Sequence, residues 1–177
     1  PKQAEQMMKN ASECLKVGGY FIGVMPDAND IMKRQKAANS DSFGNDVFEI
    51  KFHSDPNDLP IFGAKYNFHL DGVVDCPEFL VFFPAMKKLA KKYSMKLVEA
   101  TRFEDYFYQK IGRGKGLLDK MRAVERYGLQ GNHNLSRSDE DEYKHAKEYL
   151  LSKGGYDNRR KCGTLSASEW EVACKSL

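Results

Sequence analysis

The chain has 177 residues, of which 41% are hydrophobic and 12% aromatic, and a formal net charge of +3. This composition excludes a disordered protein and indicates one domain, or a large part of one, with a sizeable core. No apolar run of about 18 residues occurs, the first residues match no signal or transit sequence, and none of the four cysteines forms a CxxC pair. We therefore expect no membrane span, no metal site and a reducing compartment.

The start of the chain predicts two helices around one strand. Apolar residues recur at helical spacing on both sides of an apolar, aromatic run, which is typical of a strand buried on both faces of a parallel sheet. The predicted elements are a helix over 4–15, a strand over 20–25 and a helix over 29–38. This order is half of a doubly wound α/β unit, whose ligands bind beyond the carboxyl ends of the strands. Pro26 lies at that end, and Asp27 or Asn29 can cap the second helix.

The next segment predicts an antiparallel pair of strands, over 46–52 and 62–70, from the alternation of polar and apolar residues. A strong helix is expected to open at Asp75 and to run to about Tyr93. Three aromatic residues alternate on the second strand and fit either a sheet core or a surface that stacks on a nucleic-acid base. They are Phe62, Tyr66 and Phe68.

The last part of the chain predicts a short strand over 95–99, then an aromatic segment, a flexible basic loop and three helices. The loop is Gly112–Gly116, and the helices cover 117–126, 142–152 and a last turn capped by Ser166 or Ser168. From Pro84 to Arg126 there are twelve Lys or Arg against five Asp or Glu. This excess fits either a solvated helix face or a surface that attracts phosphate groups.

Four sequence blocks together resemble the RNA cap (guanine-N7) methyltransferase family, and the resemblance covers the whole chain. It is densest in the block that contains Pro77-Glu78-Phe79, and the last block contains Glu169-Trp170-Glu171. The four blocks are residues 10–23, 42–45, 62–81 and 163–171. The resemblance implies transfer of a methyl group from S-adenosylmethionine to N7 of the cap guanine, capped RNA as partner and the nucleus as compartment.

The resemblance also implies an α/β, Rossmann-like S-adenosylmethionine-dependent methyltransferase fold, here incomplete. Residues 1–177 are expected to be the C-terminal part of that domain: half of the sheet, an antiparallel insertion and a helical lobe over about 112–161. In vertebrate members a small activating subunit docks on this lobe. The family places the donor pocket on earlier strands, so we expect that pocket to lie mostly outside this chain, and the chain alone to be inactive.

For the guanine pocket, the resemblance maps a cap-binding glutamate onto Glu78 and supports a cap contact by Pro26. A carboxylate can accept from N1–H and N2–H₂ of guanine together, which selects guanine over adenine. The alternatives are an ordinary glutamate at a helix N-terminus and a proline that only ends a strand. A cap-contacting tyrosine of the family falls here on Ser176, so the chain departs from the family pattern at one wall of the pocket. No acid, base or metal is required, because N7 carries a free lone pair and catalysis is by orientation.

Two other functions stay open from the sequence. The chain could be a non-catalytic fragment that binds a cap or a protein, or part of an α/β methyltransferase that acts on a small molecule. The block around Pro77-Glu78-Phe79 argues against the second of these.

Overall fold

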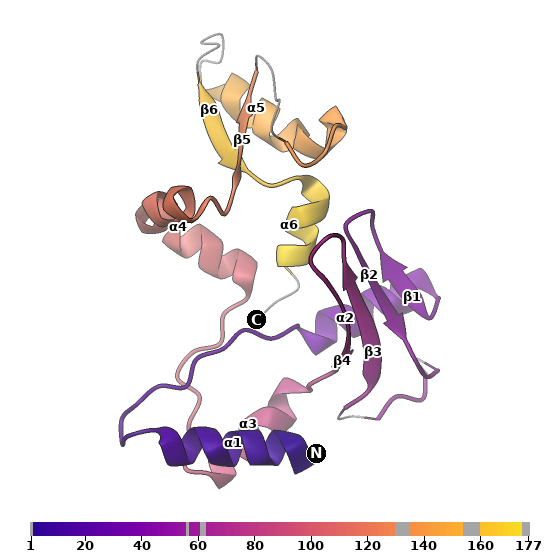
Figure 1. The fold of residues 1–177 in the computed structure, drawn as a ribbon, viewed down its shortest axis with the longest axis vertical. Coiled ribbons are helices and arrows are strands. Elements are labelled where there is room, and N and C mark those ends of the chain that lie inside the picture. The colour runs from indigo at the N-terminus through magenta and orange to yellow at the C-terminus, as the bar shows by residue number, and fades with distance from the viewer. Residues whose placement is uncertain (1, 56, 61–62, 130–134, 154–159, 175–177) are drawn as a thin grey trace. The chain divides into compact units, whose positions relative to one another are not determined.

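The computed structural model describes residues 2–55, 57–60, 63–129, 135–153 and 160–174. The chain divides into two compact units, one of residues 1–103 with 175–177 and one of residues 104–174. Each unit contains helices and its own antiparallel sheet (Figure 1), so the chain is a mixed α/β protein.

The first unit contains three helices, α1 (Lys2–Cys14), α2 (Ala28–Ala38) and α3 (Phe83–Lys92). The sequence predicted the first two correctly. Asp27 caps α2 as expected, because its carboxylate accepts the backbone N–H of Asn29 at 2.9 Å. Helix α1 packs on α3, where Glu5 accepts hydrogen bonds from Lys92 and from the hydroxyl of Tyr93.

The sheet of the first unit is a meander in which each strand pairs with the next one along the chain. Its strands are β1 (Ser42–Gly44), β2 (Phe48–Phe52), β3 (Lys65–Leu70) and β4 (Val74–Phe79), all antiparallel. The predicted antiparallel pair is therefore confirmed as β2 and β3. The turn between β3 and β4 contains Gly72 at φ 66°, a left-handed conformation that glycine adopts without strain.

One face of this sheet is apolar and carries the core of the first unit. Alternate residues of β2 are buried, and the register continues their rows across β3 onto β4. Helix α2 packs beside β1 and contributes the buried side chain of Ile31. The buried residues of the sheet itself are Phe48, Ile50, Phe52 and Tyr66.

The second unit is built around a two-stranded sheet and short helices. Its elements are α4 (Phe103–Met121), β5 (Glu125–Gly128), the 3₁₀ helix η1 (Glu140–Tyr143), α5 (Lys144–Ser152), β6 (Lys161–Thr164) and α6 (Ala167–Ala173). Tyr127 and Tyr143 stack with ring centroids 5.7 Å apart and form a core with Ala146 and Leu150. Ser166 caps α6 in a capping box with Glu169, as the sequence predicted.

The helix expected from Asp75 to Tyr93 is wrong in its first part. Residues 74–79 form the edge strand β4, and the helix begins only at Phe83 with Pro84 in its first turn. Pro77 fits this edge position because the outer side of an edge strand needs no backbone donor.

Four other predictions also differ from the structure, wholly or in part. Residues 20–25 and 95–99 lie outside any strand, because neither run has a ladder partner among the described residues. Their apolar side chains are accordingly exposed, as at Ile22 and Val98. The segment Gly112–Gly116 is helical and lies inside α4, and residues 117–126 end this helix and begin β5.

Candidate functional site

Glu78 lies on the core-facing side of β4, directly opposite Tyr66 on β3. The hydroxyl group of Tyr66 donates a hydrogen bond of 2.5 Å to Oε2 of Glu78. Tyr66 is 1% exposed, whereas Glu78 is half-buried. The glutamate therefore presents a carboxylate at the margin of the core, fixed from the buried side.

The tyrosine is itself held in place by its neighbours. Phe52 lies opposite Tyr66 on β2, and the two ring centroids are 5.9 Å apart. Burial, and then the hydrogen bond to Glu78, raise the pKa of Tyr66 far above its ordinary value. The hydroxyl therefore keeps its proton and acts as a permanent donor to the carboxylate.

The carboxylate of Glu78 retains free capacity to accept hydrogen bonds. Among the residues that the structure describes, Tyr66 is its only hydrogen-bond partner, and Oε1 accepts none. Each carboxylate oxygen has two acceptor positions, so Oε1 and one position on Oε2 can receive a pair of adjacent donors. The group can therefore bind a flat molecule with two neighbouring N–H groups, as guanine has.

The structure removes the alternative that Glu78 is an ordinary residue at a helix N-terminus. Glu78 belongs to a strand, and α3 begins at Phe83 beyond it. The favourable interaction of a glutamate with the helix dipole therefore does not explain this residue.

Pro26 and Ser176 are the other predicted pocket positions. Pro26 is exposed and precedes Asp27, the residue that caps α2, but the strand over 20–25 that it was expected to end does not form. Ser176 lies outside the described residues. Of the three predicted positions, the structure describes Pro26 and Glu78, which both belong to the first unit.

The aromatic residues of the second strand have different surroundings. Tyr66 belongs to the core, Phe68 is half-buried on the same face, and Phe62 lies outside the described residues. The sequence offered Tyr66 only as a core or stacking residue and missed its bond to Glu78. The signal was available, because residues equidistant from Gly72 face each other across the hairpin.

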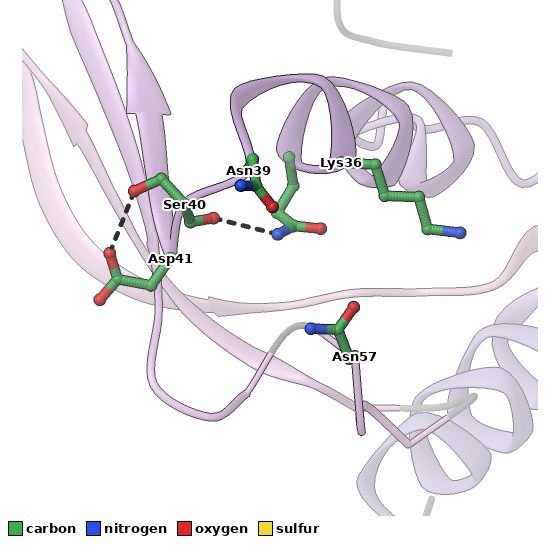
Figure 2. Close-up of a pocket in the computed structure, with 6 residues that line it drawn as sticks. Lys36, Asn39, Ser40, Asp41 and Asn57 are labelled. Atoms are coloured by element: carbon green, nitrogen blue, oxygen red, sulfur yellow. Dashed lines mark hydrogen bonds between the residues drawn. The ribbon is translucent and has the colours of Figure 1, made fainter.

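A polar pocket of about 260 Å³ lies elsewhere in the first unit, between the end of α2 and the loop after β2 (Figure 2). The side-chain amide of Gln35 donates to the backbone oxygen of Ser40 at 3.0 Å, and both residues line this pocket. None of the predicted site residues lines it, and the lining offers no aromatic face for a base. The lining residues are Gln35, Lys36, Asn39, Ser40, Asp41 and Asn57.

Within the described part of the chain, no three His, Cys, Asp or Glu side chains are grouped so that they could hold a metal ion. In the same residues, no helix combines the length and apolar character needed to cross a bilayer.

Comparison with known proteins gives consistent matches. A family model for the mRNA (guanine-N(7))-methyltransferase domain matches residues 1–176. The mRNA cap guanine-N(7) methyltransferase of Drosophila melanogaster is 46% identical over 173 residues, which cover 97% of this chain and 38% of that protein. The protein of the same name from Caenorhabditis briggsae is 38% identical, over 98% of this chain and 46% of its own length.

A plant relative shows the same pattern. The mRNA cap guanine-N(7) methyltransferase 1 of Oryza sativa subsp. japonica is 37% identical, over 84% of this chain and 41% of that protein. The chain thus spans less than half the length of these three relatives. Because the family model covers the chain almost from end to end, the chain belongs to the mRNA (guanine-N(7))-methyltransferase domain family.

Proposed function

We propose that this chain carries the guanine-holding side of an enzyme that methylates N7 of the terminal guanine of the RNA 5′ cap. Membership of the family supports this reaction. The assignment of this role to Glu78 rests on its half-buried carboxylate. One carboxylate oxygen accepts a hydrogen bond from Tyr66, and the other can accept hydrogen bonds from a ligand.

The chemistry asks for orientation and not for proton transfer. N7 of guanine is a lone-pair nucleophile without a proton to remove, so it needs only to be aligned with the methyl group. Glu78 accepts N1–H and N2–H₂ on the far edge of the base and so sets the direction of N7. Adenine has no donor at its N1 position and is rejected.

The methyl donor of the proposed reaction is S-adenosylmethionine, which supplies an electrophilic methyl group when bound. The described residues do not fit a donor pocket, because no glycine-rich turn joins a strand to a helix and the run Gly112–Gly116 lies inside α4. The proposal therefore assigns only one role to the described residues, which is to hold the guanine. The family membership supports a Rossmann-like methyltransferase sheet as part of this proposal.

Other parts of the proposal rest on the family resemblance. Pro26 is exposed and is proposed to contact the guanine or its ribose, and Ser176 stays a prediction for the second wall of the pocket. The lobe over about 112–161 is proposed to dock a small activating subunit, and the nucleus is the proposed compartment.

The test compares Glu78→Gln and Glu78→Ala with the unchanged full-length protein in methyl transfer to capped RNA. Loss of a pair of hydrogen bonds to a charged acceptor predicts a fall in kcat/KM of about 100-fold or more. Binding of S-adenosylmethionine should not change. The matched control is Glu49→Gln, since Glu49 lies on the opposite, exposed face of the same sheet. Near-normal activity of Glu78→Ala would contradict the assignment.

A further inference from the structure

The hydrogen bond between Tyr66 and Glu78 restricts how the carboxylate can turn. A glutamate side chain has three rotatable bonds. At a half-buried strand position, the last of them allows a broad range of angles, so the carboxylate plane can turn. Here Oε2 of Glu78 accepts a hydrogen bond of 2.5 Å from the hydroxyl of Tyr66 on the neighbouring strand. The ring that carries this hydroxyl is 1% exposed and is packed against Phe52, so the donor has almost no freedom of its own.

We propose that Tyr66 is a positioning residue, which holds the carboxylate plane of Glu78 so that both of its oxygens face the donors of a guanine. The proposal rests on the guanine-binding role of Glu78 and adds the group on which its specificity depends. With Oε2 fixed by Tyr66, Oε1 and the second acceptor position of Oε2 point in defined directions. One receives N1–H and the other receives the 2-amino group.

This arrangement predicts which chemical group of the cap is sensed through Tyr66. Hypoxanthine, the base of inosine, keeps N1–H and N7 but has no 2-amino group. A fixed carboxylate loses one of two hydrogen bonds when inosine replaces guanosine. A carboxylate that is free to rotate makes one good bond to N1–H with either base, and so discriminates less. Tyr66 thus contributes to recognition of the 2-amino group without touching it.

The experiment measures kcat/KM of the full-length protein for guanosine-capped and inosine-capped RNA. The unchanged protein should prefer the guanosine cap, and in Tyr66→Phe this preference should fall by about tenfold, mainly through a higher KM for the guanosine cap. Phenylalanine keeps the ring and removes only the hydroxyl. The matched control is Tyr143→Phe, because Tyr143 is also 1% exposed and also donates to a glutamate, but lies in the other unit.

A merely structural role for Tyr66 would not change the preference between two substrates. Partial unfolding lowers the rate with both caps by the same factor, so their ratio does not depend on the folded fraction. Tyr143→Phe should therefore keep the ratio of the unchanged protein even if it loses stability.

Each outcome bears on a different claim. If Tyr66→Phe keeps the ratio while Glu78→Gln loses it, the positioning role is overturned and the proposed function stands. If the unchanged protein does not distinguish the two caps, the positioning role is overturned as well. If Glu78→Gln retains normal activity and preference, the proposed guanine site itself fails.

Discussion

Tyr143 donates a hydrogen bond of 2.6 Å to Oε2 of Glu125, while Oε1 of the same carboxylate accepts the backbone N–H of Ser136 at 2.6 Å. This carboxylate therefore links η1, β5 and the segment before η1 in the second unit. The pair repeats, in a different fold context, the buried tyrosine and half-buried glutamate of the candidate site. Each unit thus contains a phenol that must keep its proton for the local structure to hold.

Stability should fall in alkali because of these two phenols. Burial first, and then the glutamate partner, raise the pKa of Tyr66 and of Tyr143 above their ordinary value. A group whose pKa is higher in the folded state adds stability below its unfolded pKa of about 10, and this is lost as pH rises toward the folded value. Urea unfolding between about pH 8 and about pH 11 measures the decline.

The corresponding phenylalanine variants should make that decline shallower. Tyr143→Phe should also lower the free energy of unfolding at neutral pH by about 1–2 kcal/mol, because Glu125 loses a buried donor. An alkaline decline that is unchanged in both Tyr66→Phe and Tyr143→Phe would show that neither phenol is responsible.

Ser166→Ala should destabilise the second unit by about 1 kcal/mol. Ser166 is fully buried, accepts the backbone N–H of Glu169 at 3.1 Å and donates its own backbone N–H to the Glu169 carboxylate at 2.9 Å. Thermal and urea unfolding measure the loss. Ser152→Ala is the control, since this exposed serine lies at the end of α5 and its loss should stay within about 0.5 kcal/mol.

Glycine-to-alanine changes test the helical assignment of residues 112–116. A Cβ at Gly112, Gly114 or Gly116 meets no atom within 4 Å, and all three lie inside α4. Alanine at each should therefore stabilise the protein by about 0.5–1 kcal/mol and raise its helical circular dichroism. A loss of stability in the triple variant would argue for the flexible loop that the sequence suggested.

The turn glycine Gly72 provides the opposite expectation. Its added Cβ also meets open space, but its φ of 66° is unfavourable for alanine. Gly72→Ala should therefore destabilise the first unit by about 1 kcal/mol. Equal effects of Gly72→Ala and Gly112→Ala would contradict the backbone conformations described for the two positions.

Acid should weaken the packing of α1 on α3. The hydrogen bond from Lys92, followed by that from Tyr93, lowers the pKa of Glu5 below its ordinary value. A carboxylate whose pKa is lowered in the folded state adds stability above its unfolded pKa of about 4.3, and this is lost as pH falls through the folded value. Glu5→Gln should lower stability at neutral pH and reduce the further loss on acidification, followed by urea unfolding. A full acid response in Glu5→Gln would exclude Glu5 as its source.

The spacing of apolar residues correctly predicted those helices and strands that depend on a single buried face. The helical spacing before Gly18 and the alternation over 46–52 gave helix α1 and strand β2, because each follows from one buried face. The helix over 75–93 failed because the helical spacing of its second half was extended back through Pro77. Asp71-Gly72, between two alternating runs, is a hairpin signal that outweighs this spacing.

The remaining differences depend on distant partners. A strand over 20–25 needs a neighbouring strand, which no periodicity supplies. The three glycines after Ile111 predicted a loop, yet they lie inside α4. Glu104 and Asp105 favour the first turn of this helix. The ring of Phe107 packs edge-on against Trp170, with ring centroids 4.9 Å apart. For the candidate site, the family resemblance indicated Glu78, whereas its partner Tyr66 follows only from the register of the β3–β4 hairpin, whose second strand had been predicted as the start of a helix.

The meander order of β1 to β4 has a kinetic consequence. Every pairing in this sheet closes a loop between strands that are adjacent along the chain, and the hairpin that joins Tyr66 to Glu78 turns through only three residues, 71–73. Short loop closures cost little entropy and are reached quickly, so this sheet should form early, before the pairing of β5 with the distant β6. During synthesis, the carboxylate proposed to receive the guanine would be in place while the second unit is still being made.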